Sequence, residues 1–192
     1  METNSPHELF FPRIDFLEEF TLPTHDKTEE FKLAEQFINL VPSERPPFAP
    51  YDNVMVIGRY QPLHYGHLYL MKQALNIGEN LTIGIGSANV RDTDNPFSPE
   101  EREYMIRKAI KKNGIGDRVF KIVYLDDNPD DDKWFERIQE KAPYVQAVVG
   151  NNDWVNGIFE GAGLEAWNVP HLNRGSYEGK KIRAYLRSIN KL

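Results

Sequence analysis

Two histidines and an arginine stand close together in one short stretch, residues 58–67, with the sequence GRYQPLHYGH. Residues 54–57 before it are apolar, and the residues after it have helical spacing, so it is expected to join a strand to a helix. Backbone N–H groups and the helix dipole at such a junction favour an anion. Arg59, His64 and His67 add positive charge there, the two histidines as an imidazolium pair. The pattern favours a site for phosphate groups in transfer over two ordinary surface histidines.

A second group of basic residues begins the last predicted helix, residues 179–190. Lys180 and Arg183 follow Gly179, so their charges would gather at another helix N-terminus. Glu178 stands directly before them, where a carboxylate opposes phosphate binding unless it points away or pairs with a lysine. The alternative is a solvated basic helix face, which is what most charge runs are.

The elements that must position these residues alternate along the chain. Short apolar strands are predicted at residues 54–57, 81–85, 120–125, 145–149 and 164–169. Helices are predicted at 66–77, 98–112, 133–141, 153–161 and 179–190, the second with Ser98 and Glu101 as a capping box. Strands separated by helices form parallel sheets, with their sites at the carboxyl ends of the strands. The sequence therefore predicts a Rossmann-like, doubly wound α/β domain of about five strands.

The charge distribution separates residues 1–50 from residues 51–192. Of the 29 acidic residues 10 lie in residues 1–50, against 4 of the 23 basic residues, so the whole net charge of −6 comes from this part. It also holds 7 of the 13 prolines, 7 of the 11 phenylalanines and no glycine. We expect an acidic, Pro- and Phe-rich arm with a short helix at 28–41, packed on the domain or on a second subunit of a homo-oligomer, before a domain at 51–192.

Composition excludes several classes of protein. No run of 18 uncharged apolar residues occurs, and the N-terminus lacks the pattern of a secretory signal. The absence of cysteine excludes disulfides, thiolate metal sites and a cysteine nucleophile. We expect a cytoplasmic protein that binds neither nucleic acid nor membranes, since its acidic total disfavours both partners.

The chemistry-bearing residues also resemble a known family. The H-x-G-H motif is the signature of the nucleotidylyltransferase superfamily, and GRYQPLHYGHL is similar to its archaeal-type nicotinamide mononucleotide (NMN) adenylyltransferases. The resemblance runs through residues 54–188 and excludes the first 50. It continues in IGSA at 85–88, NPF at 95–97, ER at 101–102, GN at 150–151, NR at 173–174 and IR at 182–183.

The resemblance implies transfer of the adenylyl group of ATP to NMN, giving NAD and pyrophosphate. It implies catalytic roles for His64, His67, Arg59 and Arg183, and ATP contacts for Gly58, Gly66, Asn151, Gly179 and Lys180. The implied NMN contacts are Gly86, Ser87, Asn95, Phe97 and Arg174. Mg²⁺ would be bound mainly through phosphates and water, so no metal-binding motif in the protein is expected.

Two departures from the family leave alternatives open. The family has a serine and a threonine where this chain has Glu178 and Lys180, which permits a nucleotide-binding sensor without efficient transfer. The loop at 87–97 is one residue shorter than usual and carries Arg91 and Asp92, which leaves other acceptors open: nicotinic acid mononucleotide, FMN or a phosphorylated alcohol. Asn95–Phe97 could equally be only a turn before a helix, and Asn151 only part of a helix cap.

Other conspicuous residues receive ordinary assignments. The acidic run at 126–132 lacks the glycine and glutamate of a calcium loop, so an exposed turn that caps a helix is expected. Trp134, Trp154 and Trp167 are expected in the core or at its rim, with one of them facing the nicotinamide as the alternative. His171, like the histidines at 7 and 25, is assigned to the surface because it has no partner at a motif spacing.

Overall fold

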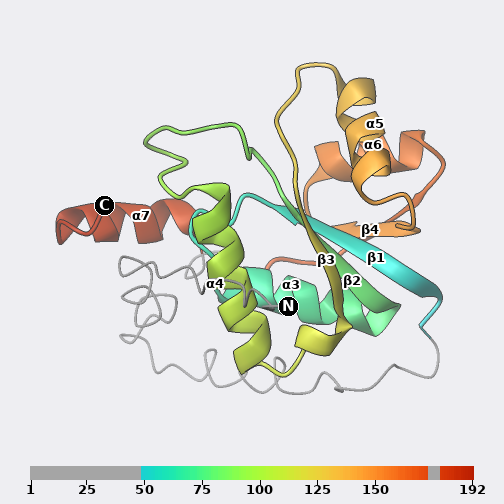
Figure 1. Cartoon of the computed structure of the whole chain (residues 1–192), viewed down its shortest axis with the longest axis horizontal. Coiled ribbons are helices and arrows are strands. Elements are labelled where there is room, and N and C mark those ends of the chain that lie inside the picture. The colour runs from blue at the N-terminus through green and yellow to red at the C-terminus, as the bar shows by residue number, and fades with distance from the viewer. Residues whose placement is uncertain (1–48, 173–177) are drawn as a thin grey trace, which may run out of the picture.

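The computed structural model describes residues 49–172 and 178–192 (Figure 1). The predicted arm with its helix at 28–41 lies outside the described residues, and so does Arg174.

Five parallel strands form a single sheet in the order β3-β2-β1-β4-β5. Their bounds are β1 Tyr51–Gly58, β2 Gly78–Ile85, β3 Val119–Tyr124, β4 Ala147–Gly150 and β5 Glu165–Asn168. The chain fills the β2 side of β1 first and then returns to the β4 side. The direction therefore reverses between β1 and β4, which is where doubly wound sheets bind ligands. The predicted fold class is confirmed.

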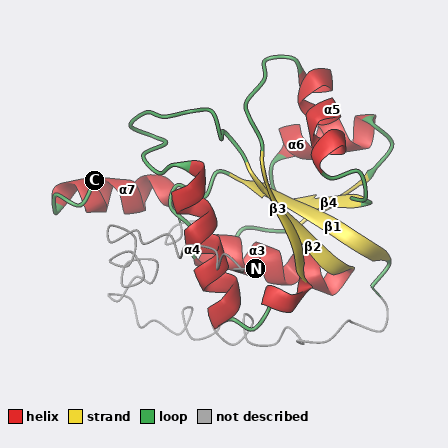
Figure 2. Cartoon of the chain, in the orientation of Figure 1, coloured by secondary structure: helices red, strands yellow, loops and turns green. Residues whose placement is uncertain are grey.

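Helices cover both faces of this sheet (Figure 2). On one face lie α3 (Tyr65–Ile77) and α4 (Pro99–Lys112), and on the other α5 (Asp131–Lys141) and α6 (Asp153–Gly161). A 3₁₀ turn, η2 (Gly116–Arg118), precedes β3, and α7 (Gly179–Ser188) is the last helix. The capping box of α4 is confirmed, since Ser98 Oγ accepts from the Glu101 N–H and Glu101 Oε2 accepts from the Ser98 N–H.

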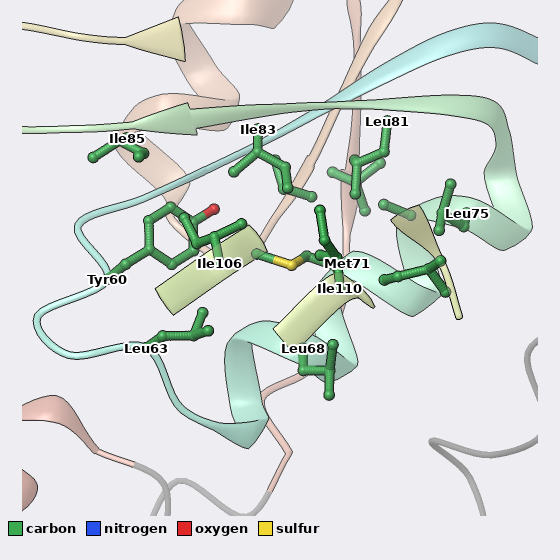
Figure 3. Close-up of a cluster of buried hydrophobic side chains, with 14 of the residues drawn as sticks. Tyr60, Leu63, Leu68, Met71, Leu75, Leu81, Ile83, Ile85, Ile106 and Ile110 are labelled. Carbon is green, nitrogen blue, oxygen red and sulfur yellow. The ribbon is translucent and has the colours of Figure 1, made fainter. Parts of the chain in front are cut away.

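Alternation along β1 divides the core into two layers. Val54 and Val56 face α3 and α4, whereas Met55 faces α5 and α6, as expected for successive residues of a strand. Figure 3 shows the first layer, where Met71 of α3 lies among apolar side chains of β2 and α4. Tyr60, from the loop after β1, is part of the same cluster, so this core also anchors the loop.

None of the helices within the described residues has the length and apolar character to cross a membrane.

Candidate active site

The two signature histidines stack on each other where β1 passes into α3. His64 is the N-cap of α3, and its ring centroid lies 3.8 Å from that of His67, with 27° between the ring planes. Tyr60 packs against His67, with 4.8 Å between their ring centroids. The backbone N–H of His64 donates to Nδ1 of His67 at 3.2 Å. Because this Nδ1 accepts, the ring proton of neutral His67 lies on Nε2, where it is a hydrogen-bond donor.

The positive charge predicted for His64 and His67 is wrong for the protein without a bound anion. Burial lowers the pKa of His64 to about 4, and His171 lowers it further by repulsion. Burial also holds the pKa of His67 well below its usual range, with a smaller contribution from His64. Two stacked, desolvated imidazoles cannot both carry charge without an anion beside them. The site therefore presents neutral N–H donors at pH 7 instead of an imidazolium pair.

Gln61 fixes the signature loop to the turn before α4. Its amide nitrogen donates to the Phe97 carbonyl, and its amide oxygen accepts from the Phe97 N–H, both at 2.9 Å. Both residues are buried, so no water competes for these bonds. Phe97, predicted to contact NMN, therefore has both backbone groups engaged and its ring in the core; it does not line the cavity.

Arg102 of α4 holds the ends of β1 and β2 together. It is fully buried, and its guanidinium donates to the carbonyls of Arg59 at 2.9 Å, Gly86 at 2.7 Å and Ser87 at 3.2 Å. A direct bond from the Gly86 N–H to the Gly58 carbonyl, at 2.9 Å, closes the same junction. The sequence resemblance includes Arg102 but implies no role for it. Its helical spacing with the buried apolar residues of α4 is the signal that could have indicated its burial.

Ser87 and Asp127 join the loops that follow β2 and β3. Ser87 has a φ of 49°, a left-handed conformation, and its hydroxyl donates to Asp127 Oδ1 at 3.0 Å. Asn89 pairs with the backbone of Asp127, accepting from its N–H at 2.9 Å. Asp130 caps α5, as the acidic run predicted, but Asp127 lines the cavity, a role that the sequence did not suggest.

These loops surround a cavity of about 390 Å³ at the carboxyl ends of the strands. Nine predicted site residues line it: Gly58, Arg59, His64, Gly66, His67, Gly86, Ser87, Asn151 and Gly179. Four other predicted residues, Lys180, Arg183, Asn95 and Phe97, are not among its lining. Trp134, Trp154, Asp127, His171 and Glu178 also line it. The specific contacts assigned to these residues remain predictions.

Arg183 binds the protein instead of facing the cavity. Its side chain is only 6% exposed, with Nη1 donating to the Gln61 carbonyl at 2.7 Å and Nη2 to the Asp94 carboxylate at 3.0 Å. Gly179 permits this approach, because a Cβ there would lie 3.0 Å from the same Gln61 carbonyl. Arg183 therefore fastens α7 to the signature loop. Lys180 is exposed on this helix.

Two departures from the expected pattern acquire structural explanations. Glu178 forms an ion pair with Lys181, 3.8 Å away, which offsets its charge at the cavity. In the shortened loop, Asp92 Oδ1 accepts from the N–H groups of Asp94 and Asn95 and from the Asn95 side chain, at 2.8 to 2.9 Å. These bonds, led by that from the Asn95 backbone, lower the pKa of Asp92. The Asn95 side chain is thus turned toward its own loop.

Aromatic and acidic side chains form another part of the cavity wall. The rings of Trp134 and Trp154 lie 5.0 Å apart, inclined by 41°. Trp154 is 49% exposed, and its Nε1 donates to Asp131 at 3.2 Å. Trp167 bonds to Tyr51 and is not among the lining residues. Aromatic faces beside a hydrogen-bonding carboxylate suit a flat, polar heterocycle.

A divalent metal ion at this site would need ligands from a bound nucleotide as well as from the protein. No group of three or more His, Asp or Glu side chains converges on a metal position within residues 49–172 and 178–192. Mg²⁺ in nucleotide sites keeps several waters and binds one or two carboxylates together with phosphates. The carboxylate of Glu178 in the cavity wall fits an ion that arrives with its nucleotide.

Comparison with known proteins places this arrangement in a family. Residues 55–160 match the cytidylyltransferase-like family. The nicotinamide-nucleotide adenylyltransferase of Halorubrum lacusprofundi is 37% identical over 128 residues, which cover 66% of this chain and 71% of that protein. The protein of the same name from Picrophilus torridus is 33% identical over 129 residues, covering 67% and 75%.

A solved structure shares the fold. It is a bifunctional NMN adenylyltransferase/ADP ribose pyrophosphatase from Francisella tularensis, complexed with AMP and a Mn ion, with a TM-score of 0.61 and 28% identity. The match covers 72% of this chain and 42% of that one, so it spans about two fifths of the bifunctional protein. On these sequence matches, the chain belongs to the cytidylyltransferase-like family and, within it, to the nicotinamide-nucleotide adenylyltransferases.

Proposed function

We propose that the protein transfers the adenylyl group of ATP to the 5′-phosphate of NMN, giving NAD and pyrophosphate. The observation that carries the proposal is the stacked His64–His67 pair in the cavity wall, at the helix N-terminus beside Arg59. Relatives at 33 to 37% identity bear the name of this activity. The role in NAD biosynthesis follows from the product.

The reaction is a direct displacement at phosphorus. A phosphate oxygen of NMN attacks the α-phosphorus of ATP; the new P–O bond forms as the bond to the bridging oxygen breaks, and that oxygen leaves with its electrons as pyrophosphate. The main obstacle is repulsion between two anions, so the protein must position them and stabilise charge. Nε2–H of His67, His64 and the guanidinium of Arg59 would donate to phosphate oxygens. The buried bonds of Gln61 and Arg102 hold those donors in place.

Mg²⁺ is the proposed cofactor; the phosphate oxygens of ATP and water would hold it, with Glu178 as the nearby carboxylate. When bound, it neutralises phosphate charge and favours the departure of pyrophosphate. The Francisella protein was crystallised with a Mn ion, which supports a divalent cation in this family.

The acceptor is proposed to be NMN and not its acid counterpart. Trp154, which is 49% exposed and packs against the buried Trp134, offers an aromatic face to a nicotinamide ring, and Asp127 adds a carboxylate to the same cavity. A carboxylate accepts hydrogen bonds from a carboxamide but repels the carboxylate of nicotinic acid mononucleotide. We therefore expect kcat/KM to be higher for NMN than for the acid, for FMN or for phosphorylated alcohols.

The test is a product assay on the full chain with ATP, MgCl₂ and each acceptor in turn. NAD and pyrophosphate should appear in equal amounts with NMN, and His67→Ala should abolish most of the turnover while its melting temperature stays near that of the parent. Tight ATP binding without release of pyrophosphate from ATP in the presence of any of the acceptors would instead identify a nucleotide sensor.

A further inference from the structure

The acceptor loop, residues 87–97, lies between β2 and α4 and takes its name from the NMN contacts that the family resemblance implies for it (Figure 1). Residues 91–94 of this loop are all exposed, so packing against the core does not hold them in place. Asp92 Oδ1 accepts from the N–H groups of Asp94 and Asn95, which shapes a local turn. The position of that turn in the molecule depends on bonds to other elements.

One face of α7 supplies such bonds. Arg183 and Arg187 are four residues apart on this helix and therefore lie on the same face. Arg183 donates to the Gln61 carbonyl at 2.7 Å and to the Asp94 carboxylate at 3.0 Å. Nη2 of Arg187 donates to the carbonyl of Thr93. This face of α7 thus joins the acceptor loop to the signature loop.

The pair of Arg183 and Asp94 is the stronger of the two contacts between α7 and the acceptor loop. The side chain of Arg183 is 6% exposed, whereas that of Asp94 is 67% exposed. In the part of the chain that the structure describes, Asp94 is the one carboxylate that pairs with this guanidinium. A buried charge that loses its counter-charge is costly, so the helix holds the loop firmly at Asp94. The bond from exposed Arg187 to a carbonyl is weaker.

The first residues of the acceptor loop hold a side chain of the cavity wall. The Ser87 hydroxyl donates to Asp127 Oδ1 at 3.0 Å, and Asn89 accepts from the Asp127 N–H at 2.9 Å. Both Ser87 and Asp127 line the cavity. Asp127 is the carboxylate proposed to face the carboxamide of NMN. The position of the acceptor loop therefore determines where this carboxylate lies.

We propose that α7 holds the acceptor loop in the conformation that binds NMN, and that Asp94 and Arg187 are positioning residues for this substrate. Neither residue is among the lining of the cavity, so each acts through the loop, by way of Ser87 and Asp127. The inference rests on the proposed use of NMN. It gives α7 a role toward the acceptor in addition to the ATP contacts that the family resemblance implies for this helix.

The test is steady-state kinetics of the full chain, with NMN and ATP varied in turn, for Asp94→Asn, Arg187→Met and the double variant. KM for NMN should rise by about fivefold in Asp94→Asn and by about twofold in Arg187→Met. KM for ATP and kcat should change less than KM for NMN in each variant. The double variant should show less than the product of the two rises, because both contacts hold the same turn.

Two matched substitutions control for the loss of charge. Asp117→Asn changes an exposed aspartate on η2, and Arg137→Met changes an exposed arginine on α5. Both positions lie outside the cavity lining, so neither substitution should alter KM for NMN. Amide hydrogen exchange of residues 91–95 gives a second measurement. It should become faster in Asp94→Asn and in Arg187→Met and stay unchanged in the controls.

An unchanged KM for NMN in Asp94→Asn would overturn the proposal. So would equal rises in the KM values for NMN and ATP, because they would show a general structural role instead of a role toward the acceptor. In both cases the parent still forms NAD and the proposed function stands. A parent that forms no NAD contradicts the proposed function and, with it, the role toward NMN, while the exchange rates still report whether α7 holds the acceptor loop.

Discussion

The two ends of the cavity are built in different ways. At the histidine end, buried side chains hold the backbone: Arg102 binds three strand-end carbonyls and Gln61 pairs with Phe97. At the tryptophan end, the wall includes more exposed residues on loops and helix starts: Trp154 donates to exposed Asp131, and the Asp127 N–H donates to exposed Asn89. Buried hydrogen bonds resist solvent and substitution more strongly than exposed ones.

This difference suggests a division of labour. Phosphate chemistry needs donors placed within a fraction of an ångström, which a buried network supplies. Recognition of the acceptor needs only a shaped and suitably polar surface, which can vary without loss of the fold. Changes at the histidine end should therefore affect turnover and stability, whereas changes at the tryptophan end should affect the choice and affinity of the acceptor.

The largest effect is expected at His67. His67→Ala should lower kcat by roughly a hundredfold to a thousandfold, the cost of losing one preorganised donor to developing charge. His67→Asn puts an amide oxygen near the position of Nδ1, so it can keep the bond to the His64 N–H while losing Nε2. Steady-state kinetics should show both variants equally impaired. Near-normal turnover in His67→Asn would mean that the residue serves only to cap α3.

The next effect is on stability and concerns Arg102. Arg102→Met leaves buried carbonyls without a donor and should lower the free energy of unfolding by about 3 kcal/mol. Arg107→Met is the matched control, since Arg107 lies on the same helix, exposed, and pairs with Glu103 at 2.6 Å. Its cost should stay below about 1 kcal/mol. Denaturant unfolding measures both, and equal costs would contradict the structural role of the buried network.

At the tryptophan end, Trp154→Ala should raise KM for NMN by about tenfold, the usual value of one stacked ring. KM for ATP and kcat should change little, because the histidine end is untouched. Trp167→Ala removes another exposed tryptophan, which lies outside the cavity lining, and should change neither constant. A rise in KM for ATP instead of NMN would reverse the assignment of the two ends.

A smaller effect is expected in the number of protons that the protein takes up when it binds ATP. His64 has a pKa of about 4 in the protein by itself, so it is neutral between pH 6 and 8. Bound triphosphate favours the charged form and raises this pKa, so binding takes up a fraction of a proton and tightens as the pH falls through that window. Calorimetry in two buffers of different ionisation enthalpy measures the uptake. His64→Asn should reduce it, and identical uptake in the variant would exclude His64 as its source.

The smallest effect on chemistry is expected from the acidic arm. Deletion of residues 1–50 should change the oligomeric state or the melting temperature more than it changes kcat. The reason is that the predicted site residues all lie between residues 58 and 183. Native mass spectrometry and kinetics on the truncated chain test this expectation. Loss of kcat in a truncated protein that is still folded would show that the arm helps to form the site.

Local sequence signals predicted most of the fold. The five strands and five helices were found near their observed positions, because apolar runs and caps such as Ser98–Glu101 are encoded within a few residues. The strand ends were less accurate. β1 and β2 each begin three residues before the predicted start, where polar residues pair across the strands: Asn80 Nδ2 donates to the Asp52 carbonyl at 3.1 Å. Such pairing depends on tertiary structure and leaves no apolar signal.

The site was predictable where a motif carried it and less so where distant residues meet. The histidine motif predicted the position of the cavity, but burial removes the positive charge predicted for the pair. His171 and Asp127 lie on separate loops and reach the cavity only through the strand order. Arg183 was expected on phosphates and instead binds Gln61 and Asp94, residues 122 and 89 positions away. Sequence spacing cannot give such contacts.

The most direct test of adenylyl transfer is a single reaction of the full chain with ATP, MgCl₂ and NMN, followed by quantification of both products. Our account predicts NAD and pyrophosphate in a one-to-one ratio, with formation that depends on His67 and with little product when nicotinic acid mononucleotide replaces NMN. A folded protein that binds ATP but forms no NAD would contradict it.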